Sequence, residues 1–96
     1  MIRITAHAIL RFLERVKNVN VTEVRRSLGC NEQGVLDYLE TTMGINVDLI
    51  KQEMIDGWVS KAIRVFKKCV IKKPEYCLVV KDYSVITVLE PKMKVT

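Results

Sequence analysis

The chain has 96 residues, a hydrophobic fraction of 49% and a formal net charge of +5. Its length suits one domain with a modest core, and no apolar run approaches the roughly 20 residues of a membrane-spanning helix, so we expect no membrane contact. The three cysteines are an odd number without metal-site spacing, and the first residues lack a secretory signal, so we expect a cytoplasmic protein without disulfides, metal or cofactor.

The first half of the chain contains two similar segments. Residues 9–28 align without a gap on residues 35–54 at an offset of 26 positions, and five of the 20 pairs are identical. This match favours duplication of one unit. The identical pairs are Leu10/Leu36, Leu13/Leu39, Glu14/Glu40, Asn20/Asn46 and Val21/Val47.

Each segment is expected to form a helix, a tight turn and a second helix. Asn18 and Gly44 follow the first helices, and both residue types tolerate a left-handed backbone. Asn20 and Asn46 are suited to cap the second helices, because a short side-chain oxygen can accept a free backbone N–H there. Thr5 is suited to cap the first helix of the chain. The segments therefore predict two helical hairpins with the same turn chemistry.

The next segment predicts a fifth, basic amphipathic helix. Trp58, Ala62, Val65 and Phe66 have the spacing of one apolar helix face, with cations on the other side. We expect Trp58 to anchor the core. A strand over residues 63–66 is the alternative.

The last part of the chain consists of short β-branched segments bounded by turn-forming residues, which predict strands. Consecutive strands with short turns form an antiparallel meander, and Pro91 is expected to close the last strand. The predicted fold class is α+β in a single domain over residues 1–96. Its parts are helical hairpins at 5–29 and 33–56, a helix at 57–68 and a three-stranded antiparallel sheet at 69–90.

Charge is segregated along the chain. Residues 1–28 carry a net charge of +4, residues 29–56 a net charge of −5 and residues 57–96 a net charge of +6. This asymmetry indicates an anionic partner for the basic parts, with Trp58 and Tyr83 available to stack on bases. The alternative is that the acidic hairpin neutralises its basic neighbours or complements a second copy. The candidate nucleic-acid-binding residues are Arg25, Arg26, Lys61, Arg64, Lys67, Lys68, Lys72 and Lys73.

His7, Arg11 and Arg15 are spaced by four residues and lie along one side of the first predicted helix. His7 falls in the first turn, where the positive end of the helix dipole disfavours a charged imidazole. A neutral histidine beside arginines suits a general base next to phosphate-binding groups, as RNA cleavage requires. The alternative is a solvated helix face with His7 partly covering the sheet. The matching positions of the second segment hold Gln33, Asp37 and Thr41.

Two segments carry a resemblance to known proteins. Residues 4–16 resemble the opening of small bacterial and prophage proteins with the pattern I-T-x-H-A-x-x-R-x-x-E-R, and Tyr76–Leu89 resembles the strands that close those proteins. These proteins are distantly similar to RelE/barnase-like ribonuclease toxins, which pack N-terminal helices on an antiparallel sheet. The chain departs from the pattern by an extra helical hairpin, which could block the basic site or redirect the domain to a protein. The resemblance implies these catalytic candidates: His7, Arg11, Arg15 and Thr87.

These observations leave three hypotheses for the function. The first is a non-enzymatic binding module of phage or prophage type that engages nucleic acid or a nucleoprotein through basic surfaces, as an inhibitor or modulator of a host system. The second is a metal-independent endoribonuclease of toxin type that uses His7 with Arg11 and Arg15. The third is a protein-interaction domain that associates with a second copy, as a homodimer, by charge pairing.

Overall fold

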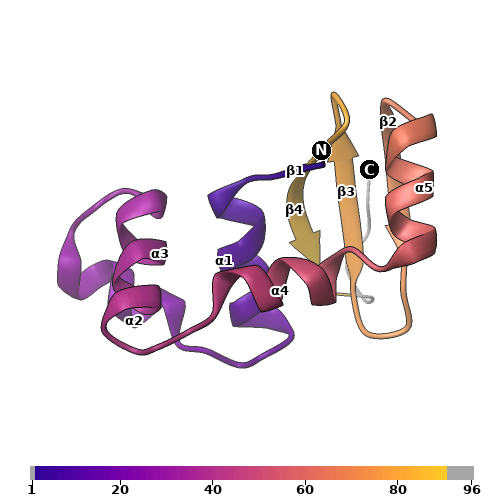
Figure 1. The fold of residues 1–96 in the computed structure, drawn as a ribbon. Coiled ribbons are helices and arrows are strands. Elements are labelled where there is room, and N and C mark those ends of the chain that lie inside the picture. The colour runs from indigo at the N-terminus through magenta and orange to yellow at the C-terminus, as the bar shows by residue number, and fades with distance from the viewer. Residues whose placement is uncertain (1, 91–96) are drawn as a thin grey trace.

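Residues 2–90 are the part of the chain that the computed structural model describes, and they form five helices and one four-stranded sheet (Figure 1). None of these helices is long and apolar enough to cross a membrane. Pro91, the expected end of the last strand, lies outside the described residues. In chain order the elements are β1 (Arg3–Ile4), α1 (Ala6–Arg15), α2 (Val21–Leu28), α3 (Glu32–Thr41), α4 (Val47–Met54), α5 (Gly57–Val65), β2 (Lys68–Lys72), β3 (Cys77–Lys81) and β4 (Ser84–Leu89).

The sheet is mixed and has the strand order β1-β4-β3-β2. The expected antiparallel meander of β2, β3 and β4 is confirmed. However, β1 adds a parallel pair with β4, in which Ile4 stands opposite Val85, so the expectation of a three-stranded, purely antiparallel sheet is wrong. Two residues are too few to show the alternation that identifies a strand in a sequence. Parallel strands also need a crossover between them, and here all five helices lie between β1 and the meander.

The two hairpins have the same boundaries at the offset that the sequence predicts. α1 and α2 begin and end 26 positions before α3 and α4. Asn20 Oδ1 accepts the backbone N–H of Glu23 at 3.2 Å, and Asn46 Oδ1 accepts that of Leu49 at 3.1 Å. Thr5 caps α1 in the same way. The expected N-caps are therefore confirmed.

The turns inside the hairpins also match. Asn18 (φ 57°) and Gly44 (φ 71°) both have the left-handed backbone expected of them. The residue after each donates its N–H to the preceding helix, at 2.9 Å in the first hairpin and 3.2 Å in the second. The hairpins therefore share a scaffold, and their origin by duplication stays a prediction.

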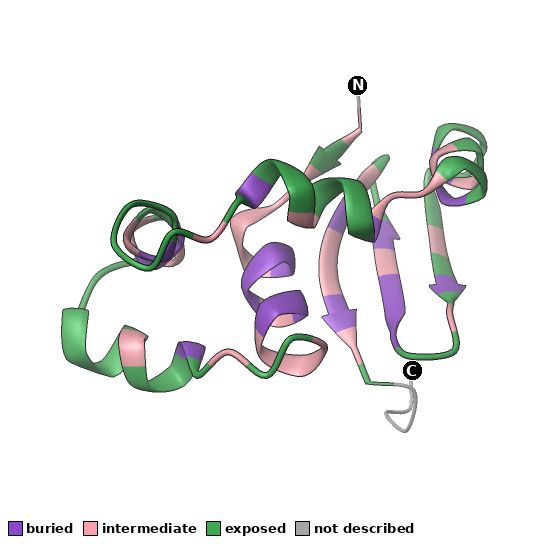
Figure 2. Cartoon of the chain, turned by 60° about the horizontal axis from the view of Figure 1, so that its bottom comes forward, coloured by how far each residue is buried: buried purple, intermediate pink, exposed green. Residues whose placement is uncertain are grey.

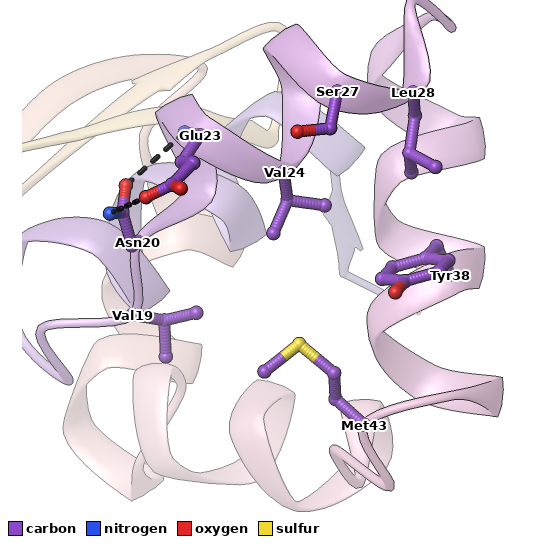
Figure 3. A pocket seen from close by; sticks show the side chains of 8 residues that line it. All are labelled: Val19, Asn20, Glu23, Val24, Ser27, Leu28, Tyr38 and Met43. Atoms are coloured by element: carbon purple, nitrogen blue, oxygen red, sulfur yellow. Dashed lines mark hydrogen bonds between the residues drawn. The ribbon is translucent and has the colours of Figure 1, made fainter.

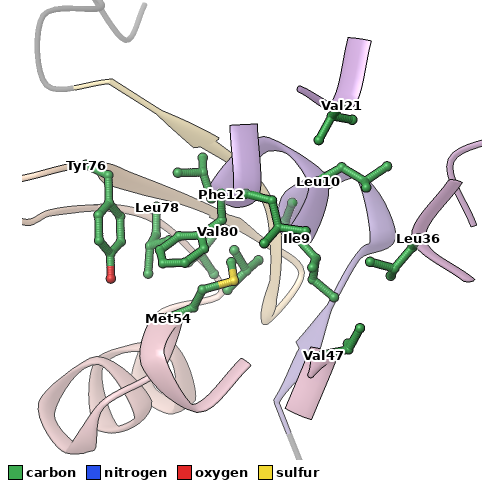
Figure 4. Close-up of a cluster of buried hydrophobic side chains, with 14 of the residues drawn as sticks. Ile9, Leu10, Phe12, Val21, Leu36, Val47, Met54, Tyr76, Leu78 and Val80 are labelled. Atoms are coloured by element: carbon green, nitrogen blue, oxygen red, sulfur yellow. The ribbon is translucent and has the colours of Figure 1, made fainter. Parts of the chain in front are cut away.

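The hairpins pack against each other reciprocally: α1 contacts α4, α3 contacts α2, and α1 contacts α3. Leu10 and Val21 are buried, as are their equivalents Leu36 and Val47, and all four belong to one hydrophobic cluster (Figure 4). Burying apolar surface away from water stabilises the folded state by roughly 25 cal/mol per Å². Each hairpin therefore depends on the other to cover its apolar positions.

The sheet buries one of its faces against α1. Leu78 and Val80 of β3 are fully buried, whereas Val79 between them points to the other face. The rings of Phe12 on α1 and Tyr76 before β3 pack edge-to-face with their centroids 5.1 Å apart. As Figure 2 shows, α1 is largely buried, whereas α2 is largely exposed.

The predicted fifth helix is confirmed as α5, but it ends at Val65 and not at residue 68, since β2 begins at Lys68, and the apolar side expected of it is wrong. Val59 and Ile63 are fully buried, whereas Trp58 and Phe66 are each 55% exposed, so the expectation that Trp58 anchors the core is wrong. Two apolar stripes overlap on this helix, and the stripe at positions 59, 62 and 63 faces the core. α5 therefore presents an aromatic edge to solvent.

Candidate nucleic-acid interface

The three residues of the predicted His/Arg stripe are all engaged within the protein. His7 Nδ1 lies 2.5 Å from Glu32 Oε2, at the start of α3. Arg11 donates to a glutamate one turn further along α1 at 2.8 Å, and Arg15 donates to a backbone carbonyl of β4 at 2.5 Å. The stripe thus joins α1 to its neighbours α3 and β4.

The glutamate beside Arg11 is Glu14, which also accepts a hydrogen bond from the Thr22 hydroxyl at 3.0 Å. Burial by itself would raise the pKa of Glu14, but the hydrogen bonds from Thr22 and Arg11 outweigh it and leave the pKa below its ordinary value. The ionised carboxylate therefore balances the charge of Arg11 at neutral pH.

Thr87, the fourth ribonuclease candidate, lies on the other face of the sheet. It stands opposite Val79, which alternates with two buried residues of β3 and so points away from α1. His7 and Arg15 are themselves separated by about 12 Å along α1, at 1.5 Å per residue. The structure therefore does not bring the four candidates together.

The predicted nucleic-acid-binding cations fall into three separate groups. Arg25 and Arg26 lie on α2, which Figure 1 places at the opposite end of the molecule from α5 and β2. The other two groups lie at the two ends of β2, so the cations do not form one continuous patch. The second group is Lys61, Arg64, Lys67 and Lys68, on α5 and at the start of β2, and the third is Lys72 and Lys73, at the far end of β2.

Lys73 takes part in the fold itself. Its ammonium lies 2.8 Å from Asp56 Oδ2 and 5.3 Å from the centroid of the Tyr76 ring. The hydrogen bond from Lys73 is the main cause that holds the pKa of Asp56 below its ordinary value. Burial alone would lower the pKa of Lys73, but Asp56 and Tyr76 raise it above its ordinary value. Lys73 is therefore committed to an internal contact rather than to an external phosphate.

The outward side of α5 combines cations with an aromatic ring. Trp58, Lys61 and Arg64 are all exposed and follow one another at intervals of three residues, so they lie along one side of the helix. Phe66 comes directly after α5 and is also exposed. This side of α5 extends for about 13 Å, given nine residues at 1.5 Å each.

A row of three cations and one serine crosses the adjoining end of the sheet. Lys68 of β2 stands opposite Lys81 of β3, Lys81 opposite Ser84 of β4, and Ser84 opposite Arg3 of β1. Like charges directly opposite one another destabilise a sheet, so stability does not explain the pair of lysines. An anion that lies across this row would relieve the repulsion.

The turn between β3 and β4 holds Tyr83 beside this row. Asp82 and Tyr83 both have positive φ values, 52° and 59°, in a two-residue turn that usually contains Asn-Gly. The N–H of Tyr83 donates to the carbonyl of Lys67 at 3.2 Å, which ties the turn to the start of β2. The tyrosine ring is 50% exposed. A backbone conformation that is uncommon for tyrosine thus holds an exposed tyrosine at the end of the sheet where β2 begins.

We call the exposed cations and aromatic side chains along α5 and at the adjoining end of the sheet the basic–aromatic surface. Lys81 alternates with the buried Val80, so the row across the sheet lies on the face that points away from α1. The sequence predicted four of its six cations and two of its three aromatic residues, Trp58 and Tyr83, as candidates. It missed the remaining three members. The sequence places Phe66 on the apolar face of the predicted helix, and the row across the sheet follows only from the strand register. The basic–aromatic surface comprises Arg3, Trp58, Lys61, Arg64, Phe66, Lys67, Lys68, Lys81 and Tyr83.

Comparison of the chain with protein-family models, with curated proteins and with solved structures finds no match. Among residues 2–90, no group of histidine, cysteine and carboxylate side chains is arranged to hold a metal ion. The function therefore has to be inferred from the chain's own surface.

Proposed function

We propose that this protein is a binding module that holds single-stranded nucleic acid on the basic–aromatic surface and does not cleave it. The observation that carries this proposal is the exposure of three aromatic rings, those of Trp58, Phe66 and Tyr83, among cations. Every base of a single strand has a π-face that can stack on such a ring, whereas a duplex buries these faces between its own base pairs.

The energetics of such a surface favour binding without sequence preference. Stacking of a base on an aromatic side chain contributes about 1–3 kcal/mol, and each phosphate neutralised by lysine or arginine releases counterions, so affinity falls with salt. The acidic hairpin, with a net charge of −5 over residues 29–56, repels a nucleic-acid backbone. The strand is therefore directed to the end of the molecule that carries α5 and the sheet.

Several contacts support binding over cleavage. The His7 ring is paired with Glu32, Arg15 is bound to a backbone carbonyl, and Thr87 is on the far face of the sheet. A general base and a phosphate-binding group must converge on one reacting site. A module that occupies nucleic acid or a nucleoprotein without cleaving it fits the role of a phage or prophage modulator of a host system.

The direct test is fluorescence anisotropy of labelled short RNA and DNA, as single strands and as duplexes, over a range of salt concentrations. We expect salt-dependent binding with a preference for single strands. Phe66→Ala and Tyr83→Ala should each weaken it by about tenfold, because each removes one stacking platform worth about 1–3 kcal/mol. Leu49→Ala is the matched control, since Leu49 is an exposed apolar residue on α4 outside this surface. Binding that is equally strong in both aromatic variants would contradict the proposal.

A second measurement addresses the ribonuclease hypothesis. Purified protein is incubated with mixed RNA in EDTA, and the products are resolved on a gel. We expect intact RNA both with the unaltered protein and with His7→Ala. Cleavage that disappears in His7→Ala would favour the endoribonuclease and remove the binding-only proposal.

A further inference from the structure

The two hairpins occupy equivalent positions in the sequence but have different neighbours in space. α4 contacts α1, and α2 contacts α3, which is the equivalent pair at the offset of 26. Tyr76, directly before β3, contacts both helices of the first pair, through the Phe12 ring and the Glu53 carbonyl. The offset of 26 makes Phe12 and Met54 of the first junction equivalent to Tyr38 and Leu28 of the second. The covered junction therefore indicates what kind of group fits the open one.

In the covered junction, an aromatic side chain from the sheet fills the space. Phe12 and Met54 are fully buried, and the Tyr76 ring packs edge-to-face on Phe12 at 5.1 Å. The Tyr76 hydroxyl donates to the backbone carbonyl of Glu53 at 3.5 Å, and Lys73 lies over its ring. The group that fits this junction is thus a tyrosine at the start of a strand, with a lysine beside it.

The open junction is a groove of about 280 Å³ between α2 and α3. Figure 3 shows Val24, Leu28, Tyr38 and Met43 directed into it from opposite walls. Leu28 is 40% exposed, whereas Met54, its equivalent in the covered junction, is fully buried. The groove therefore has the apolar walls of the covered junction without its tyrosine.

We propose that this groove is the docking site of a partner protein that inserts a tyrosine or phenylalanine from a β-hairpin, with a lysine or arginine beside it. Tyr38 would receive the ring edge-to-face as Phe12 receives Tyr76, since aromatic pairs favour this arrangement. The inference goes beyond the proposed function, because the groove lies on α2 and α3, at the opposite end of the molecule from α5 (Figure 1). The protein would then join nucleic acid to a protein partner.

Charge complementarity supports a cation in that partner. Glu23 is the only charged residue among the eight that line the groove. One of its oxygens accepts a hydrogen bond from Asn20 at 2.8 Å, and a carboxylate has the capacity for further hydrogen bonds. In the covered junction a carboxylate likewise meets a lysine, as Asp56 binds Lys73. In the proposed complex, the aromatic side chain of the partner would fill the apolar part of the groove, and the adjacent cation of the partner would pair with Glu23.

The probe for the test is a peptide with the sequence of residues 72–78, which carries Lys73 and Tyr76, with Cys77→Ser to prevent oxidation. It is titrated into the intact, isotope-labelled protein, and amide chemical shifts are followed by NMR. We expect saturable shifts at Val24, Leu28 and Tyr38. The peptide with Tyr76→Ala should bind at least tenfold more weakly, because it lacks the ring that fills the groove.

The protein variant Leu28→Glu should also weaken the peptide at least tenfold, whereas Leu49→Glu, at an exposed position on α4, should bind as the unaltered protein does. Glu23→Lys should weaken binding, and a peptide with Lys73→Glu should restore it. If a protein variant keeps the thermal midpoint of the unaltered protein, its weaker binding is not caused by a folding defect. The proposal is overturned if millimolar peptide shifts no groove residue, or if Leu28→Glu binds equally well. Concentration-dependent self-association that Leu28→Glu abolishes would also overturn it, because a second copy would then occupy the groove.

Discussion

The first and second hairpins are built on one scaffold but differ in what covers them. Both have an asparagine cap on the second helix and a left-handed residue in the turn. Met54 at the end of α4 is fully buried, while Leu28 at the end of α2 is 40% exposed. Asp56 binds Lys73, whereas the matching residue Cys30 is exposed. Local chemistry therefore determines each hairpin, and the sheet determines which of the two helix junctions, α1 with α4 or α2 with α3, is covered.

The same contrast applies to the outer sides of α1 and α3. In α1 the side chains of His7, Arg11 and Arg15 bind neighbouring groups in α3, α1 and β4. In α3 the equivalent positions include Asp37 and Thr41, which are exposed and bonded only within their own helix. The charged stripe that suggested catalysis thus connects α1 to its neighbours α3 and β4.

The largest expected effect comes from truncating the two equivalent apolar positions. Met54→Ala should lower the free energy of unfolding by about 2–5 kcal/mol, the range for a fully buried side chain that leaves a cavity. Leu28→Ala should lower it by about 1 kcal/mol or less, because the side chain is partly solvated already. Urea denaturation followed by circular dichroism measures both. Equal losses would mean that the sheet does not distinguish the α1–α4 junction from the α2–α3 junction.

The next largest effect separates the cations of the basic–aromatic surface from those of the first hairpin by their contribution to nucleic-acid binding. Replacing Lys67 and Lys68 by alanine should reduce the slope of log affinity against log salt by about 1.4, since each phosphate contact on a single strand contributes about 0.7. Replacing Arg25 and Arg26 on α2 should leave the slope unchanged. Anisotropy titrations at several salt concentrations give both slopes. A loss of slope only in the α2 variant would move the interface to the first hairpin.

Much of the fold follows from short-range signals in the sequence. The caps at Thr5, Asn20 and Asn46 and the left-handed turns involve residues a few positions apart, so their chemistry can be read before the structure is known. β1 could not be predicted, because a two-residue strand has no periodicity and its partner Val85 is 81 positions from Ile4. Strands that pair over such a distance leave no local pattern.

The candidate site was less predictable than the fold for a similar reason. Two apolar stripes overlap on α5, and only the packing against the core decides that Val59 is buried and Trp58 exposed. The role of Lys73 depends on Asp56, which is 17 positions away in the sequence. The opposition of Lys68 and Lys81 depends on strand register. Cations and aromatic rings can be listed from a sequence, but their convergence is a tertiary property.

Both hairpins have an asparagine as the N-cap of their second helix. Asn20→Ala and Asn46→Ala should each lower the free energy of unfolding by about 0.5–2 kcal/mol, the usual loss when an N-cap is removed. The two losses should be similar, because both side chains accept the same N–H three residues on, at 3.2 and 3.1 Å. Thermal or urea denaturation measures them. If only one of the variants is destabilised, the hairpins do not share their capping energetics.

The smallest effect concerns the ion pair of Asp56 with Lys73, which Cys30, the matching residue of the first hairpin, cannot make. The pKa of Asp56 is lowered below 3.8, mainly by the hydrogen bond from Lys73, so its stabilising contribution is present above pH 3.8 and is lost as pH falls through the folded-state pKa. The pKa of Lys73 is raised above 10.5, so its contribution is present below pH 10.5 and is lost as pH rises through the folded-state pKa. Asp56→Asn should therefore lower the thermal midpoint between these limits and lose its effect in acid. Cys30→Ser, at the matching position of the first hairpin, should show no such pH dependence. Asparagine is itself a good N-cap, so the variant can keep the hydrogen bond from the Val59 N–H. A difference between Asp56→Asn and the unaltered protein that persists unchanged in strong acid would therefore mean that the charge of Asp56 is not its cause.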